Sequence, residues 1–342
     1  MQRINEEVFM REAMFWSAEA DGSVRCALCP HLCHIALGAR GVCRVRENRA
    51  GVLYSLNYGR IVASNIDPIE KKPLYHYLPG SQSFSVAGAG CNMHCRHCQN
   101  ASISQVDEAV PGKEVTAQQI VTAAQGGGCR TIAYTYTEPT IYFETMLETA
   151  TLARKAGLDN IMISNGYMEA APFEQLAPLL QAVNIDLKAF DDKVYRTLCG
   201  ARLQPVLESL RRFYAAQIWL EVTTLIIPGY NDDPAQLQQL AGFIVSELGP
   251  EVPWHVSAFY PTYRLLDVVP TPVESIRRAC EIGAQAGLHY VYGGNVAGVC
   301  EHTVCSACQH VVVERRGYQI AQIDLHAGEC SACGAKVAGV WE

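Results

Sequence analysis

The stretch Gly90-Cys-Asn-Met-His-Cys-Arg-His-Cys-Gln-Asn100 places three cysteines, Cys91, Cys95 and Cys98, in one short loop. Gaps of three and two residues let the loop give three thiolates to one iron–sulfur cube and leave the fourth iron without a protein ligand. Electron-transfer clusters are normally closed by four cysteines, whereas a catalytic metal keeps one position open. A four-ligand zinc knuckle is the alternative, but the next cysteine is Cys129. The loop therefore predicts a reactive metal centre.

This spacing resembles that of the radical SAM superfamily. The resemblance implies a 4Fe-4S cluster whose open iron chelates the methionyl amino and carboxylate groups of S-adenosylmethionine (SAM). It also implies an oxidoreductase-type enzyme that cleaves SAM to methionine and a 5′-deoxyadenosyl radical, which takes hydrogen from a substrate. Side chains cannot perform such one-electron chemistry, so the protein supplies orientation and excludes water. A reducing electron donor is an implied partner.

Composition limits the other classes of function. A chain of 342 residues with 49% hydrophobic residues can form two or three globular domains. The net charge of −7, without a basic run, predicts neither nucleic-acid nor membrane partners. Residues 1–7 lack the apolar region of a signal peptide, and no apolar run is long enough to span a bilayer, so we expect a cytoplasmic protein. Most of the 15 cysteines fall in three clusters with ligand spacing, which indicates metal binding rather than disulfides.

The middle of the chain alternates strand and helix signals, the pattern of parallel β/α units. Strands are expected at 83–89, 131–136, 160–164, 183–187, 219–227 and 254–259, and helices at 116–125, 140–156, 171–180 and 234–248. Thr116 with Gln119, and Thr271 with Glu274, are spaced as capping boxes at helix starts. About six units fit, fewer than the eight of a closed TIM barrel. The fold class is therefore α/β, and the resemblance implies a partial (β/α)6 TIM-like barrel.

Parallel β/α folds place active sites at the carboxyl ends of strands. Tyr136-Thr137-Glu138-Pro139 stands where many radical SAM enzymes have Gly-Gly-Glu-Pro, so the resemblance assigns Thr137 and Glu138 to the amino group of SAM. A helix start is the alternative reading. Ser164-Asn165-Gly166 resembles the Thr-Asn-Gly turn of glycyl-radical activating enzymes, which implies contacts from Ser164 and Asn165 to the ribose and carboxylate of SAM. An ordinary turn is the alternative.

Asp186-Leu187-Lys188 matches an Asp-x-Lys motif of the same activating enzymes. Residues two apart on a strand share a face, so Lys188 could pair with the carboxylate of SAM while Asp186 orients it; an exposed ion pair is the alternative. His97 occupies a position where the family usually has an aromatic residue that packs near adenine. Gln99-Asn100 also resembles the activating enzymes. We therefore include His97 and Asn100 among the cofactor-binding residues, and expect His255 to be a core histidine.

Four cysteines near the amino terminus lie within 18 residues: Cys26, Cys29, Cys33 and Cys43. Four thiolates can close either a zinc site or a second 4Fe-4S cluster, and geometry alone allows both. His31 and His34 are alternative ligands. We favour the cluster because this segment leads into the barrel. Without metal it has few apolar residues with which to fold, so disorder is the alternative.

The carboxyl terminus contains Cys305-x2-Cys308, then 21 residues, then Cys330-x2-Cys333. Two such pairs predict a zinc ribbon, with strands turning near Arg316-Gly317. A rubredoxin-like iron site uses the same ligands. The remaining cysteines are expected to be buried core thiols: Cys129, Cys199, Cys280 and Cys300.

The order of these motifs, with Asp67-Pro-Ile-Glu-Lys-Lys-Pro-Leu-Tyr-His-Tyr-Leu-Pro-Gly80 before the cysteine loop, resembles the radical SAM enzyme of the AmmeMemoRadiSam system. That resemblance implies AMMECR-type and Memo-like partners. It divides the chain into a Cys-rich module at 1–55, a barrel at 56–298 and a ribbon at 299–342. The alternatives are a glycyl-radical-enzyme activating enzyme and a non-catalytic iron–sulfur or zinc scaffold or electron carrier. SAM cleavage separates the last class from the others.

Overall fold

The computed structural model describes residues 11–107 and 109–342. They form two compact units: the first contains the described residues up to Asp67 together with Gln82–Gln181, and the second contains Pro68–Ser81 and Ala182–Glu342. Residues 1–7, for which the sequence predicts no signal peptide, lie outside the described part, and the predicted boundaries at 55 and 299 stay predictions. None of the helices in the described ranges is long and apolar enough to cross a membrane.

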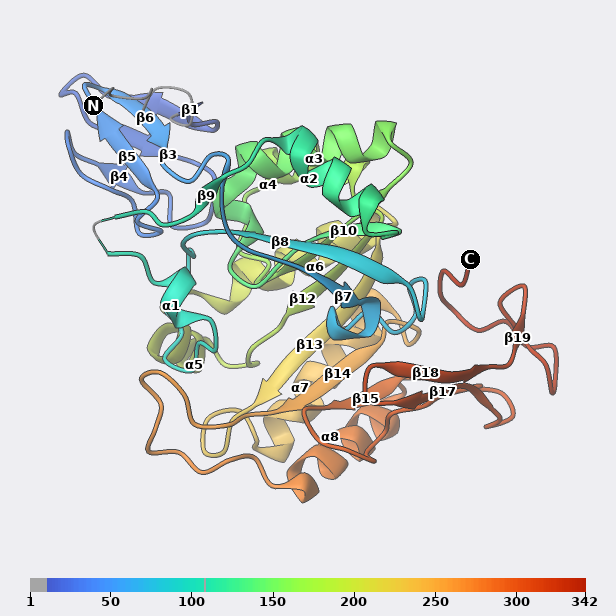
Figure 1. Ribbon diagram of the computed structural model, residues 1–342. Helices are drawn as coiled ribbons and strands as arrows, with labels where there is room; N and C mark the ends of the chain where they lie inside the picture. Colours follow the sequence, from blue (N-terminus) through green and yellow to red (C-terminus); the bar gives the residue numbers. More distant parts are fainter. Residues whose placement is uncertain (1–10, 108) are drawn as a thin grey trace. The chain divides into compact units, whose positions relative to one another are not determined.

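Parallel strands form the centre of the first unit. Strand β10 (Thr131–Tyr134) lies between β8 (Gln82–Gly88) and β11 (Asp159–Ser164) and pairs in parallel with both. Helices α2 (Ala117–Gly126) and α3 (Phe143–Lys155) lie on the same side of β8 and β10 (Figure 1). Shorter helices are α1 (Ala101–Ser104) and α4 (Ala170–Leu176), the latter continued by a 3-10 turn at Ala177–Leu179. The predicted β/α alternation is confirmed here, including the capping box in which Thr116 accepts a hydrogen bond from the Gln119 N–H.

The amino-terminal part of this unit consists of small antiparallel sheets rather than disordered chain. One has the order β1 (Arg11–Glu12), β6 (Val52–Ser55), β5 (Arg46–Arg49), and the other the order β2 (Trp16–Ala18), β3 (Val24–Cys26), β4 (His34–Ile35). Strand β7 (Arg60–Pro68) pairs with β9 (Lys113–Glu114). The buried Arg46 guanidinium lies 2.5 Å from Glu144 on α3 and 2.7 Å from the Met14 carbonyl oxygen, so these sheets are fixed to the helical layer.

In the second unit four strands pair in parallel in chain order: β12 (Ala182–Asp186), β13 (Trp219–Ile226), β14 (Trp254–Ala258) and β15 (Val291–Gly294). Its helices are α5 (Asp192–Val194), α6 (Leu203–Ala215), α7 (Pro234–Phe243) and α8 (Val273–Ala286), with π-helical turns at Tyr195–Cys199 and Ile244–Leu248. Helix α8 packs on β14 and β15 (Figure 1). Strand β15 was not among the six expected strands, because it is short and ends in two glycines.

The predicted capping box at Thr271 is wrong. Helix α8 begins after Pro272, and no side chain caps it. The Thr271 hydroxyl instead donates to the Ile226 carbonyl at 2.5 Å and accepts from the Phe259 N–H at 2.9 Å. Tertiary contacts to the ends of β13 and β14 have therefore replaced the local cap.

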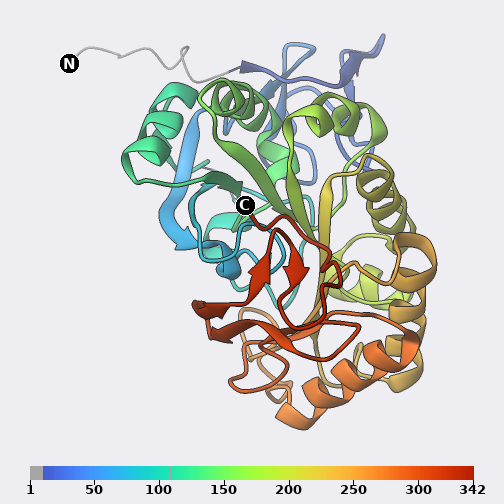
Figure 2. The same cartoon turned by 90° about the vertical axis from the view of Figure 1, so that its right-hand side faces the viewer.

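The carboxyl-terminal segment folds into hairpins, shown in red in Figure 2. Strands β16 (Thr303–Val304), β17 (Val311–Arg316) and β18 (Gln319–Ile323) are antiparallel, and β19 (Leu325–His326) pairs with β20 (Glu329–Cys330). The predicted turn near Gly317 is confirmed, with a left-handed φ of +60° there. The hairpins share a hydrophobic core with the 68–81 segment. Arg315 of β17 donates a hydrogen bond to the Tyr75 carbonyl of that segment at 2.7 Å.

Candidate active site and metal centres

The cluster loop, residues 91–98, follows β8 through two glycines that tolerate no side chain. A Cβ at Gly88 would lie 2.8 Å from Tyr142, and one at Gly90 would lie 2.9 Å from Val45 and 3.1 Å from the Cys43 carbonyl oxygen. Gly90 also has a φ of +97°, which favours glycine. The loop is thus held closely against its surroundings.

The three thiols of the cluster loop influence one another. Burial raises the pKa of Cys91 well above its usual range, and the Glu138, Cys95 and Cys98 charges raise it further, although the Met93 N–H donates to its sulfur at 3.3 Å. Cys95 is buried, whereas Cys91 and Cys98 are partly exposed. The three thiolates repel one another when they are ionised, and a bound metal cation would neutralise their negative charges. This donor set fits a 4Fe-4S cluster with one open iron.

The turn after β10 is hydrogen-bonded to residues on both sides of the cluster loop. Asn100 donates its side-chain amide to the Tyr136 carbonyl at 2.7 Å, and the Thr137 hydroxyl donates to the Gly88 carbonyl at 2.6 Å. Tyr136 has a left-handed φ of +63°, so strand β10 ends two residues earlier than expected. His97 is buried at 6% exposure within the same loop.

Glu138 connects the ends of two strands. Its Oε1 accepts from the Ser164 hydroxyl at 2.8 Å and from the Thr140 N–H and hydroxyl at 2.9 and 2.6 Å, and its Oε2 accepts from the Asn165 N–H at 2.9 Å. Burial raises the pKa of Glu138, and these donors oppose that rise. Glu138 also caps the 3-10 turn at Pro139–Tyr142, as the helix-start interpretation predicts.

Asn165 completes the path from Glu138 to the cluster cysteines. Its side-chain amide donates to Asn92 Oδ1 at 2.8 Å and lies 3.7 Å from Cys91 Sγ. Asn92 was not identified from the sequence, because its neighbours along the chain give no signal for this contact. The structure therefore brings Glu138, Ser164 and Asn165 together with Cys91.

In the second unit, Lys188 Nζ lies 2.8 Å from Asp186 Oδ2. The two side chains are 15% and 37% exposed, so the pair is accessible and less screened by solvent than a fully exposed one. Asp186 lies in register with Thr223 of β13, Thr223 with His255 of β14, and His255 with Tyr292 of β15. His255 is a core residue as expected, 2.6 Å from Glu221.

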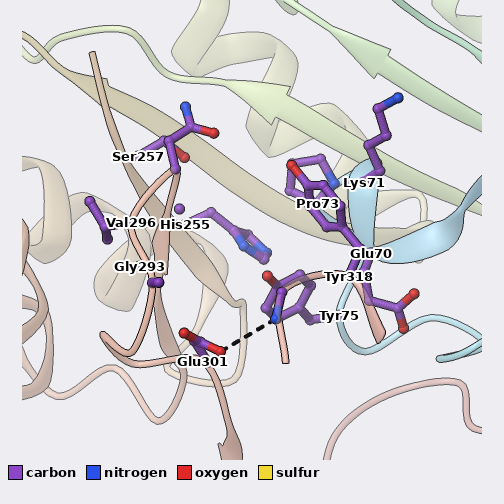
Figure 3. Close-up of a pocket in the computed structure, with 14 residues that line it drawn as sticks. Glu70, Lys71, Pro73, Tyr75, His255, Ser257, Gly293, Val296, Glu301 and Tyr318 are labelled. Atoms are coloured by element: carbon purple, nitrogen blue, oxygen red, sulfur yellow. Dashed lines mark hydrogen bonds between the residues drawn. The ribbon is translucent and has the colours of Figure 1, made fainter. Parts of the chain in front are cut away.

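The second unit also contains a cavity of about 280 Å³ that the sequence did not reveal. The His255 and Tyr75 rings lie beside each other in it at a centroid distance of 4.8 Å (Figure 3). Ser257 and the glycines that end β15 form another part of its lining. The Gly293-Gly294-Asn295 run was the available signal, since such a run at a strand end favours close approach of backbone. The cavity is large enough to hold a small molecule.

The ribbon tetrad, Cys305, Cys308, Cys330 and Cys333, is compact. Its four sulfurs lie within 4.8 Å of one another, with Cys305 to Cys333 and Cys308 to Cys330 both 3.7 Å apart. The two turns repeat one geometry: the N–H of Gln309 donates to the Cys305 carbonyl and that of Gly334 to the Cys330 carbonyl, each at 2.8 Å. Both donors have left-handed φ values. Of the cysteines outside the metal sets, Cys300 is exposed, which corrects its expected burial.

Sequence comparisons agree with this geometry. The model of the Radical SAM superfamily matches residues 85–241. The uncharacterized protein MJ0808 of Methanocaldococcus jannaschii is 45% identical over 332 residues, which cover 96% of this chain and 99% of that protein. The chain belongs to the radical SAM superfamily. Membership implies a 4Fe-4S cluster and SAM, and radical SAM enzymes are catalytic.

Relatives with a named activity match less of this radical SAM chain. The isethionate sulfite-lyase activating enzyme of Oleidesulfovibrio alaskensis is 26% identical over 181 residues, 48% of this chain and 55% of that enzyme. Among solved structures, SuiB of Streptococcus suis bound to S-adenosylmethionine has a TM-score of 0.51 at 14% identity, covering 66% of this chain and 53% of SuiB. A radical SAM methyltransferase of Sphaerobacter thermophilus has a TM-score of 0.50 at 17% identity, covering 66% and 70%. These structures support the fold alone.

Proposed function

We propose that this protein is an enzyme that cleaves SAM reductively at a 4Fe-4S cluster held by Cys91, Cys95 and Cys98. When bound, the cluster and SAM supply one-electron chemistry that gives methionine and a 5′-deoxyadenosyl radical for hydrogen abstraction from a substrate. The observation that carries the proposal is the hydrogen-bonded path from Glu138 through Asn165 to Cys91. A scaffold or electron carrier without catalysis needs no SAM-binding groups, whereas the resemblance assigns Glu138 and Asn165 to SAM.

The chain's own residues bind and orient SAM. Glu138 acts as a positioning residue, because its oxygens fix Ser164 and Asn165. The Asn165 amide then orients polar groups beside the cluster loop, and His97 stacks near adenine. Lys188 binds the carboxylate of SAM, with Asp186 holding the ammonium in place.

The decisive test is anaerobic incubation of reconstituted protein with SAM and a reductant, with 5′-deoxyadenosine and methionine measured. Cys95→Ala is expected to abolish cleavage. Cys129→Ala, which removes a buried thiol outside the three metal sets, is the matched control and is expected to retain it. Undiminished cleavage by Cys95→Ala would show that the cluster assignment is wrong.

We further propose that the ribbon tetrad binds one zinc ion in a structural role. Tetrahedral zinc with Zn–S distances of about 2.3 Å requires sulfurs close to the 3.7 Å separations found here. Four thiolates leave no open position, so this site is unreactive. A rubredoxin-like iron would fit the same distances, and metal analysis distinguishes the two.

For the family within the superfamily, we propose the radical SAM enzyme of the AmmeMemoRadiSam system, acting with AMMECR-type and Memo-like proteins and an electron donor. Support comes from the order of the motifs along the chain. Coverage weighs against a simple activating enzyme, because the isethionate sulfite-lyase activating enzyme aligns with only 48% of this chain, whereas MJ0808 aligns with 96%. A glycyl-radical-enzyme activating enzyme is the competing function. Incubation with SAM, reductant and each candidate protein, followed by mass spectrometry of every component, tests both. A glycyl radical formed in a lyase, with neither AMMECR-type nor Memo-like protein bound or modified, would favour the competitor.

A further inference from the structure

Backbone turns gather the amino-terminal thiols. We call Cys26, Cys29, Cys33 and Cys43 the N-terminal tetrad. The Cys26 N–H donates to the Cys33 carbonyl at 2.9 Å, and the Leu32 N–H donates to the Cys29 carbonyl at 3.0 Å. A Cβ at Gly41 would lie 3.6 Å from Cys33 Sγ, so the turn that carries Cys43 packs on Cys33.

Groups that can stabilise metal-bound thiolates surround the tetrad. Backbone N–H groups of His31, Val42 and Val45 donate to Cys29, Cys33 and Cys43 respectively. Hydrogen bonds to sulfur and buried positive charge adjust the potentials of iron–sulfur clusters. The buried Arg46 guanidinium, which interacts with the Cys26 and Cys43 charges, supplies that positive charge.

The distances between sulfur atoms distinguish the N-terminal tetrad from the ribbon tetrad. One zinc ion draws its four sulfurs together, and the ribbon sulfurs lie within 4.8 Å of one another. Among the described residues, the N-terminal tetrad forms no such compact group, although its charges interact. A four-iron cube binds each thiolate at a different iron and needs sulfurs farther apart than one ion does. Among the described residues, Cys91, Cys95 and Cys98 likewise do not form a compact group with one another.

The histidines do not complete the set. His31 Nε2 lies 2.7 Å from the Asn92 carbonyl oxygen, and His34 Nε2 lies 2.7 Å from the Ser23 hydroxyl. We therefore take the four thiols as the ligands. Four protein ligands close a cube and leave no iron for SAM.

The tetrad lies directly beside the cluster loop. His31, between two tetrad cysteines, contacts Asn92, the residue after Cys91. Its ring meets Tyr167 at a centroid distance of 5.1 Å, just after the Ser164-Asn165-Gly166 turn. The Cys43 carbonyl oxygen would lie 3.1 Å from a Cβ at Gly90, the residue before Cys91. His31 thus contacts the cluster loop, and Cys43 lies against the glycine that precedes it.

From this arrangement we propose that the N-terminal tetrad binds a second 4Fe-4S cluster, closed by four thiolates and adjacent to the cluster loop, which serves as a one-electron carrier. Its oxidised 2+ form takes one electron from a low-potential donor of the ferredoxin or flavodoxin class and becomes the 1+ form. The placement beside a SAM-binding loop rests on the proposed function, whereas the metal assignment does not.

The experiment uses full-length protein reconstituted anaerobically with iron and sulfide. The decisive variant is Cys91→Ala/Cys95→Ala/Cys98→Ala, which removes the ligands of the first cluster. It is expected to retain about four iron atoms per chain, compared with about eight in the parent. After reduction it should take up about one electron per chain and give a four-iron electron paramagnetic resonance signal that SAM does not change. A variant with no iron and one additional zinc ion, or with no metal at the tetrad, would overturn the proposal.

A second variant removes a ligand of the N-terminal tetrad and leaves the cluster loop intact. Cys33→Ala is expected to lose about half of the parent's iron, while Cys129→Ala keeps all of it. Equal iron in Cys33→Ala and the parent would refute the ligand assignment, and the triple variant decides the question if Cys33→Ala does not fold. Failure of SAM cleavage by the parent, with iron retained in the triple variant, would refute the proposed function and leave the second cluster in place.

Discussion

Glu138 Oε2 accepts a 2.9 Å hydrogen bond from the backbone N–H of Asn165, which links the turn after β10 to the end of β11. The Asn165 side chain carries this link on to Asn92 and to Cys91 Sγ. Both oxygens of the buried Glu138 carboxylate accept hydrogen bonds from the protein, so its role is to hold neighbouring groups in place. The geometry of the cluster loop therefore depends on a residue that was selected from sequence as a direct contact of SAM.

Replacing Glu138 with Gln tests this positional role. The amide places a donor where the carboxylate accepts, so at least one buried N–H or hydroxyl loses its partner. We expect a loss of about 1–3 kcal/mol in unfolding free energy and weaker SAM binding, measured by urea titration and by equilibrium binding. Glu174→Gln, on the exposed side of α4, is the control. Unchanged SAM affinity in Glu138→Gln would remove Glu138 from the site.

Lys188→Ala is expected to weaken SAM binding by about 1–3 kcal/mol, since a charge-assisted hydrogen bond to the carboxylate of SAM is removed. Lys193→Ala changes the same residue type on α5 and should have no effect. An equilibrium titration of SAM against both variants provides the measurement. Equal affinities would show that the Lys188–Asp186 pair is a surface ion pair only.

Sequence patterns along the chain predicted most helices and strands, and the wrong predictions have physical causes. The Thr116–Gln119 capping box formed because the start of α2 is exposed and nothing competes for those side chains. Thr271 has the same spacing, but carbonyl and amide groups of neighbouring strands bind its hydroxyl instead. Strand β15 was missed because pairing with β14, rather than its own sequence, stabilises it.

In the candidate site, too, local sequence patterns predicted some features, whereas others depend on tertiary contacts. Cysteine spacing predicted the ligands, because one loop must reach several metal positions. The contact between His31 and Asn92, 61 residues apart, follows from packing of the amino-terminal sheets and leaves no local signal. The proposal of a cube rather than zinc at the N-terminal tetrad likewise depends on the three-dimensional separation of the sulfurs, which residue spacing does not give.

Acid is expected to destabilise the second unit through His76 and Glu221. Burial lowers the pKa of His76 from 6.5 to about 4, with the Arg315 and His255 charges acting in the same direction and the Glu221 charge opposing them. Between these values the unfolded chain binds the proton and the folded chain does not, so unfolding free energy falls as pH decreases, by up to roughly 3 kcal/mol. Burial opposes ionisation of Glu221, but His255 and Trp219 hydrogen bonds hold its pKa below normal, so its contribution is also lost in acid.

Urea unfolding at pH 7.5, 6.5 and 5.5 measures this slope. His76→Gln removes the titrating group and should flatten the slope, although it also costs the contacts of His76 with Tyr292 and Ala338. Zinc content is determined at each pH, so that metal loss is separated from protonation. A slope identical in parent and variant would show that His76 does not cause the acid sensitivity.

The ribbon tetrad gives the last prediction. Cys305 and Cys330 are buried in the same core cluster as Tyr75, Tyr290 and Val313, so loss of the metal should loosen this core as well as the hairpins. Cys330→Ser is expected to lose one zinc ion per chain and to expose 299–342 to proteolysis, because so short a segment buries too little apolar surface by itself. Cys300→Ser, an exposed thiol outside the tetrad, is the control and should keep its zinc. Elemental analysis that finds equal zinc in Cys330→Ser and the parent would exclude this ligand set, and iron in place of zinc would identify a rubredoxin-like centre.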